Sequence, residues 1–101
     1  MNFGKMMKQV QQAQAKMAQI QEELAHETVE ASAGGGMVRV VMTGALEVRE
    51  VSIDPAAVDP DDVELLSDMV TAAVNEALRS AQELASSRMA AVTGGLNLPG
   101  M

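Results

Sequence analysis

The first 24 residues of the chain carry one continuous apolar stripe with heptad spacing. Its positions follow one another at alternating steps of three and four, and they are Phe3, Met6, Val10, Ala13, Met17, Ile20 and Leu24. This spacing places the side chains along one narrow edge of an α-helix, and the residues between them are mostly good helix formers. We therefore predict a helix over about residues 2–25. We expect a seam on it, for a second copy of the chain or for another helix, formed by Met6, Val10, Ala13, Met17, Ile20 and Leu24.

After residue 27 the apolar period changes from helical spacing to alternation. Residues 28–33, 37–43 and 46–53 alternate in this way, and glycines at 34–36 and 44 separate them. Alternation bounded by turn residues is typical of half-buried strands. The three segments predict an antiparallel sheet over about residues 28–54. The alternation changes phase near Arg49 and Glu50, which predicts a β-bulge or a strong twist.

Asp59 and Pro60 predict the start of a second long helix, because Asp is a favoured N-cap and Pro suits the first helical position. Apolar residues then recur at steps of three and four to about residue 91, and Gly94 and Gly95 provide a stop signal. We predict a helix over about residues 60–91 and a flexible tail over about residues 94–101. Such a helix spans roughly 45 Å, which exceeds a compact domain of this length, so it overhangs and favours a dimer.

The composition describes one domain of 101 residues whose core is filled by small or flexible apolar side chains. The chain has nine Met and one Phe, and it lacks Trp, Tyr and Cys. The lack of Cys excludes disulfides and thiolate chemistry. No apolar run approaches the ~18 residues that span a bilayer, so we expect a cytoplasmic protein that does not interact with membranes.

Charge is segregated along the chain. The formal net charge is −7, yet the first 20 residues hold Lys5, Lys8 and Lys16 and no acid. Residues 21–88 hold fourteen acids against four arginines. The first helix is therefore a basic arm on an acidic body. Its lysines precede its glutamates, an order that opposes the helix dipole, and packing or an anionic ligand would explain it. From the residues alone, a solvated surface and an anion contact are equally good interpretations of the lysines.

Three further features invite a chemical interpretation, and a structural role explains each of them better. The glycines at 34–36 lie between two strands and lack the helix and the Lys-Ser/Thr pair of a P-loop. The acids at 59–64 miss the spacing of a calcium loop. His26 is the single histidine and would have to carry any acid–base mechanism. We therefore expect no enzyme, no cofactor, no metal site and no small-molecule substrate.

A series of short motifs, taken in order, resembles the YbaB/EbfC family of bacterial nucleoid-associated proteins over essentially the whole chain. The motifs are Met7-Lys8-Gln9, Gln21-Glu22-Glu23-Leu24, Val38-Arg39-Val40 after the glycine-rich turn, Val51-Ser52-Ile53-Asp54-Pro55, Ala72-Ala73-Val74-Asn75-Glu76-Ala77, Thr93-Gly94-Gly95-Leu96 and Leu98-Pro99-Gly100.

The resemblance implies an α+β fold with an α-β-β-β-α protomer, in which two long helices flank a three-stranded antiparallel sheet. It also implies a tweezer-like homodimer that binds double-stranded DNA in the cytoplasm, in contact with the nucleoid, with possible effects on nucleoid organisation and gene expression. The residues here that match the family's DNA-contacting role are Lys5, Lys8, Lys16, Arg79 and Arg88. Phe3 is the sole aromatic residue for base stacking, so single strands are not expected. The alternative is a protein-interaction or scaffolding dimer without direct DNA binding.

Overall fold

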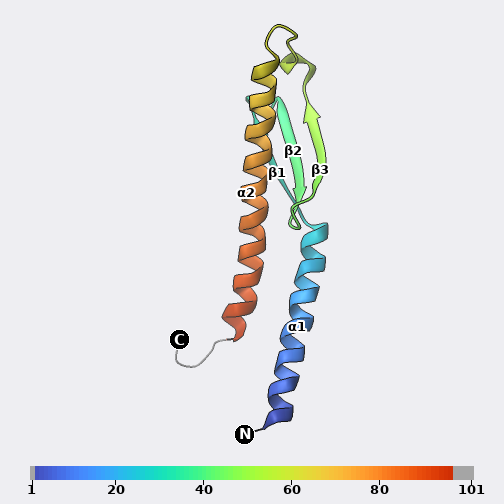
Figure 1. The fold of residues 1–101 in the computed structure, drawn as a ribbon, viewed down its shortest axis with the longest axis vertical. Helices are drawn as coiled ribbons and strands as arrows, with labels where there is room; N and C mark the ends of the chain where they lie inside the picture. Colours follow the sequence, from blue (N-terminus) through green and yellow to red (C-terminus); the bar gives the residue numbers. More distant parts are fainter. Residues whose placement is uncertain (1, 97–101) are drawn as a thin grey trace.

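The computed structural model describes residues 2–96, and it has the predicted α-β-β-β-α order (Figure 1). The elements are α1 (Phe3–His26), β1 (Thr28–Ala33), β2 (Val38–Thr43), β3 (Val48–Ile53), the short 3-10 helix η1 (Pro55–Ala57) and α2 (Val63–Leu96). The molecule is a rod of 72 × 25 × 16 Å with a radius of gyration of 19.8 Å. A compact chain of 100 residues has a radius near ~13 Å, so much of this chain lies outside a common core.

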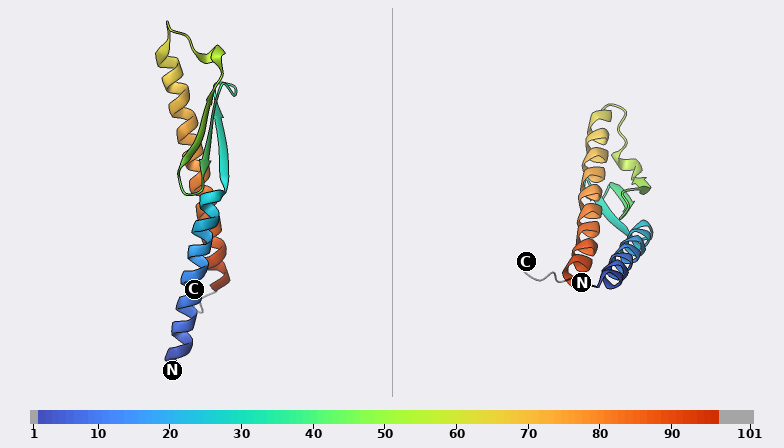
Figure 2. Two further views of the ribbon diagram at one scale, coloured as in Figure 1. Left: turned by 90° about the vertical axis from the view of Figure 1, so that its right-hand side faces the viewer. Right: turned by 60° about the horizontal axis from the view of Figure 1, so that its bottom comes forward.

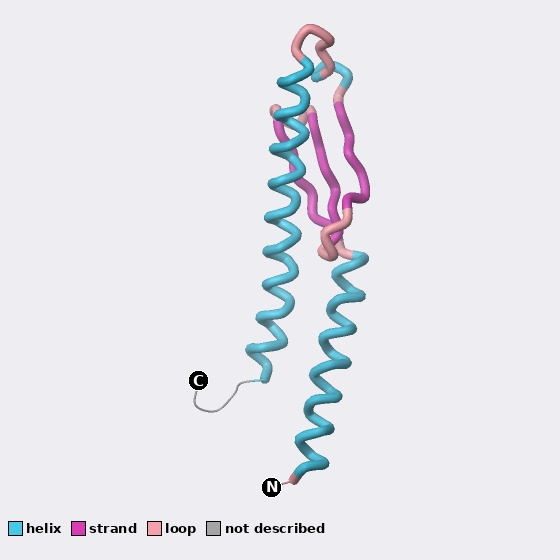
Figure 3. The backbone as a smooth tube through the Cα atoms, viewed as in Figure 1, coloured by secondary structure: helices cyan, strands magenta, loops and turns pink. Residues whose placement is uncertain are grey.

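The sheet is antiparallel with the strand order β1-β2-β3 (Figure 3). Gly34, Gly35 and Gly36 all have positive φ in the turn between β1 and β2, a backbone conformation that glycine adopts without strain. In the β2–β3 pairing, Val41 lies opposite Glu50 while the next residue, Met42, lies opposite Val48. Arg49 is therefore the extra residue of a bulge, which confirms the predicted phase change.

Helix α2 packs on one face of the sheet and covers β1 and β2 (Figure 2). The buried core consists of Ala31, Val38, Val40, Met42, Ala73, Ala77 and Ala81. The three α2 alanines recur every four residues, so the helix presents a smooth edge that lies close to the strands. The same face of β3 is left open, and its Val48, Val51 and Ile53 side chains remain 49%, 44% and 42% exposed.

The boundaries of α2 differ from the prediction at both ends. The helix begins at Val63 and not at residue 60, because Asp59 builds a separate turn: its side chain accepts from the Asp61 N–H (2.9 Å) and its carbonyl from the Asp62 N–H (3.0 Å). The Asp62 side chain then accepts from the Leu65 N–H (3.2 Å), as an N-cap does.

The stop signal predicted at Gly94 and Gly95 is wrong, since α2 continues through both residues to Leu96. A glycine inside a helix costs only about 1 kcal/mol relative to alanine, so two of them weaken a helix without having to end it. The predicted tail therefore shares residues 94–96 with the helix, and residues 97–101 lie outside the described part of the chain.

Helix α1 extends beyond the end of the sheet instead of covering one of its faces (Figure 1). It begins where the Asn2 side chain accepts from the Lys5 N–H (3.2 Å). Its buried residues are Ile20 and Leu24, both in the part nearest the sheet. Between residues 2 and 96, neither helix has the length and apolar content needed to cross a membrane.

Candidate nucleic-acid interface

The three lysines of α1 lie on one side of the protruding helix. At 3.6 residues per turn, Lys5, Lys8 and Lys16 fall within an arc of about 80°, and Lys5 and Lys16 are roughly 16 Å apart along the axis. All three are exposed, and within residues 2–96 none of them forms a salt bridge. The first acidic residue of α1 is Glu22. We call Lys5, Lys8 and Lys16 the lysine strip.

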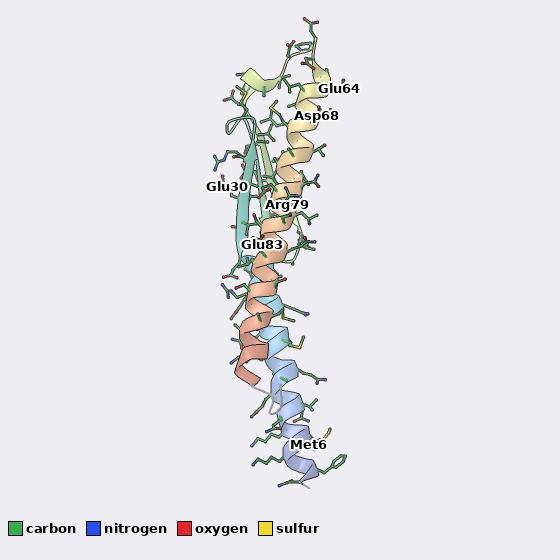
Figure 4. The ribbon with its side chains drawn as sticks, turned by 90° about the vertical axis from the view of Figure 1, so that its left-hand side faces the viewer. Met6, Glu30, Glu64, Asp68, Arg79 and Glu83 are labelled. Atoms are coloured by element: carbon green, nitrogen blue, oxygen red, sulfur yellow. The ribbon has the colours of Figure 1, made fainter. Side chains whose placement is uncertain are left out.

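The predicted seam occupies another side of α1 and is only partly covered in the single chain. Ile20 and Leu24 are buried and Ala13 is half-buried, whereas Met6, Val10 and Met17 are 51%, 49% and 40% exposed. Figure 4 shows Met6 near the free end of α1, away from the labelled residues of the sheet and α2. In the single chain, therefore, only the half of the seam that lies next to the sheet is covered.

The two arginines predicted to act with the lysines lie on α2, where each has an acidic partner. Arg79 donates to Glu76 (2.7 Å), one turn away, and its side chain is 66% exposed. Arg88 reaches across to α1, where it pairs with Glu23 (3.7 Å) and donates to Glu27. The structure thus separates the five predicted cations into the lysine strip, one surface ion pair on α2 and one link between the helices.

Arg49 is a functional candidate that the sequence did not reveal. As the extra residue of the β3 bulge, it donates from Nη2 to the Ala25 carbonyl (3.0 Å), close to the C-terminal end of α1. A cation at this end of a helix interacts favourably with the helix dipole. The change of phase around residue 49 indicated the bulge, but nothing in the sequence indicated the target of the side chain.

An open hollow lies beside the same end of α1 and is lined by Glu22, Glu23, His26, Glu27 and Arg88. Its carboxylates face an arginine that already neutralises part of their charge. Over residues 2–96 no group of three or more His, Cys, Asp or Glu side chains is placed to hold a metal ion. The hollow is therefore part of the attachment of α1.

A sequence model described as the YbaB/EbfC DNA-binding family matches residues 1–96. The chain belongs to the YbaB/EbfC DNA-binding family. A nucleoid-associated protein of Moorella thermoacetica is 57% identical over 99 residues, which cover 98% of this chain and 95% of that protein. A nucleoid-associated protein of Thermoanaerobacter sp. (strain X514) is 54% identical over 100 residues, covering 99% of this chain and 90% of that protein.

A solved structure shares the fold of this YbaB/EbfC chain. The crystal structure of an uncharacterized protein from Helicobacter pylori superposes with a TM-score of 0.78 at 22% identity, covering 96% of this chain and 99% of the other. The α-β-β-β-α fold of this chain therefore also occurs in a solved structure.

Proposed function

We propose that this YbaB/EbfC protein is a nucleoid-associated protein that binds duplex DNA as a homodimer, mainly through phosphate contacts. The observation that carries the proposal is the lysine strip: Lys5, Lys8 and Lys16 are exposed, lie on one side of α1 and have no salt-bridge partner within residues 2–96. The name shared by the Moorella and Thermoanaerobacter relatives supports a place for this chain in the cytoplasm at the nucleoid, where it would affect nucleoid organisation and gene expression.

Phosphates are the part of DNA that the lysine strip suits. Lysine is a flexible point charge that follows a charged backbone without reading bases, and releasing counterions from phosphates supplies most of the affinity of such contacts. Arg79 adds a cation on α2, because an exposed pair such as Arg79–Glu76 contributes little and exchanges readily for a phosphate. Arg88 is the weakest of the five candidates, since moving it to a phosphate would leave Glu23 and Glu27 without their partner.

The net charge of −7 does not oppose binding at the free end of α1. Glu22 is the nearest acid along the helix, and by helical rise it lies roughly 25 Å from Lys5, 21 Å from Lys8 and 9 Å from Lys16. Physiological salt screens exposed charges beyond about 8 Å. DNA that approaches the end of α1 therefore meets the local positive charge before the acidic body.

Two uncovered apolar surfaces support the homodimer. One is the open face of β3, formed by Val48, Val51 and Ile53, and the other is the exposed part of the seam on α1. A single chain of this size has a modest core, and a second copy would cover both surfaces while adding a second lysine strip. Two protruding helices on one dimer would give the tweezer-like shape that the family resemblance implies.

The first experiment is fluorescence anisotropy on a mixed-sequence duplex at several salt concentrations, with the oligomeric state measured on the same sample by light scattering. We expect a dimer that binds at micromolar or lower concentration with a salt slope of several units, as phosphate contacts require. A dimer that fails to bind at low salt would refute DNA binding and favour the alternative, a scaffolding dimer that recruits a protein partner. A monomer that binds DNA would refute the dimeric part of the proposal alone.

A further inference from the structure

Most of α1 is exposed to solvent. From Phe3 to Gln19 the sole residue that is not exposed is Ala13, and burial begins at Ile20. The direction of the lysine strip is therefore set by the last two turns of α1 and by the residues around them, which we call the root of α1.

Three contacts from the sheet and its β2–β3 turn hold the root. Leu24 packs so closely on the β2–β3 turn that a Cβ on Gly44 would lie 2.7 Å from Leu24 Cδ2 and 3.0 Å from the Leu24 carbonyl. The Gly44 N–H donates to the Glu27 carbonyl (3.0 Å), just beyond the end of the helix. The Arg49 guanidinium donates to the Ala25 carbonyl from the bulge in β3 (3.0 Å). These contacts all join the end of α1 to the sheet, and none of them joins α1 to α2.

Arg88 supplies an ion-pair link from α2. It is 61 residues away from Glu27 in the sequence, and it pairs with two carboxylates one turn apart, Glu23 on the helix and Glu27 at its C-cap. Glu27 Oε2 is buried and has no hydrogen-bond partner among the described residues. The negative charge of the Glu27 carboxylate is therefore compensated by Arg88. If Arg88 moved away, water would have to enter the root to solvate this carboxylate.

Small rotations at the root have large effects at the lysine strip. Lys5 and Lys16 lie roughly 33 Å and 16 Å along the helix from Glu27. A rotation of about 10° at the root would then move Lys5 by roughly 6 Å and Lys16 by roughly 3 Å. Phosphates succeed one another every 3.4 Å of axis along a DNA strand, so such a displacement is enough to separate lysines from the phosphates they face.

We propose that Arg88 is a positioning residue: its link to Glu23 and Glu27 fixes the angle between α1 and α2, and hence the direction in which the lysine strip meets DNA. The inference rests on the proposed DNA binding by α1 and assigns Arg88 a role other than that of a phosphate ligand.

The test measures the angle directly in the absence of DNA. The chain has no native cysteine, so spin labels at Gln9→Cys and Gln82→Cys, both exposed, report the distance between α1 and α2. Labelled protein is refolded with an excess of unlabelled protein so that distances within one protomer dominate. Arg88→Gln should broaden the distance distribution, and the charge swap Arg88→Glu with Glu27→Arg should narrow it again. Arg79→Gln, which removes the same charge from an exposed pair on α2, should leave it unchanged.

DNA binding supplies the second readout. Arg88→Gln should weaken binding roughly eightfold at 0.1 M salt for each lysine contact that the moving arm loses, and the charge swap should restore the affinity. An unchanged distance distribution in Arg88→Gln would overturn the proposal, and so would a folded charge-swapped protein whose distribution stays broad. If Arg88→Gln fails to fold, the charge-swapped protein decides alone by the same criterion. Parent protein that does not bind DNA would refute the proposed function, whereas the distances still decide the role of Arg88.

Discussion

Neutralising the lysine strip tests the proposed DNA contact most directly. If each of Lys5, Lys8 and Lys16 neutralises one phosphate, replacing all three by glutamine removes three contacts from each arm. The slope of log K against log salt should then fall by about 2.7 for each arm that is bound. One contact is worth roughly eightfold in affinity at 0.1 M salt relative to 1 M, so three contacts amount to roughly 500-fold. The fold should be unaffected, because all three side chains are exposed.

Two control variants separate local contact from overall charge. Replacing the three lysines by arginine keeps the charge and should keep the slope. Adding three acids at exposed positions away from the strip changes the net charge by the same amount as the triple glutamine variant, and it should alter the slope little; the positions are Ser32→Glu, Ala72→Glu and Ser86→Glu. Anisotropy titrations at four or more salt concentrations measure all the slopes. A triple glutamine variant with the parent slope, or an acidic control with an equal loss, would show that the strip does not contact phosphates.

Three further predictions concern the assembly and the core. Val51→Asp places a charge on the open face of β3 and should convert the proposed homodimer to a monomer, as measured by light scattering, while Ser52→Asp on the opposite face should not; a dimeric Val51→Asp protein would exclude β3 from the interface. Gly44→Ala should lower the thermal midpoint through its clash with α1, at a cost of about 1–3 kcal/mol, whereas Gly4→Ala in the open part of α1 should be neutral or stabilising. Ala77→Leu should cost a similar 1–3 kcal/mol by forcing α2 off the sheet, and an unchanged midpoint would refute the close approach of α2.

Local patterns were sufficient to predict the helices and strands of this fold, because the apolar residues of each element recur with the period of a helix or of a strand. Alternation located the strands, and the change of phase at Arg49 located the bulge, since one extra residue moves every later side chain to the other face. The ends of α2 were harder to predict. Asp59 and Asp62 are both favoured N-cap residues, and Pro60 pointed to Asp59. The actual start at Asp62 depends on the separate turn that Asp59 forms with its neighbours.

The coverage of each apolar surface could not be predicted, because it depends on where α2 lies across the sheet. Val40 and Val51 face each other on adjacent strands and look equivalent in the sequence, yet Val40 is fully buried and Val51 is 44% exposed. Helix α2 is about 10 Å wide and covers two strands of this sheet, which leaves the third strand open. The sequence therefore identifies which side chains are apolar, and the packing decides which of them are left for a partner.

The charge order of α1, which opposes its own dipole, is explained by residues distant in the sequence. The glutamates near its C-terminal end would be unfavourable in an isolated helix. In the folded chain Arg49 donates to the Ala25 carbonyl, and Arg88 pairs with Glu23 and Glu27, so two cations from β3 and α2 occupy the place that lysines of α1 itself would normally take. This arrangement leaves the lysines of α1 in its first 14 residues, where nothing within residues 2–96 pairs with them. The attachment of the root and the unpaired lysine strip are thus two parts of one charge pattern. Glu23 and Glu27 pair with an arginine of α2, and the lysines remain available to an anionic partner.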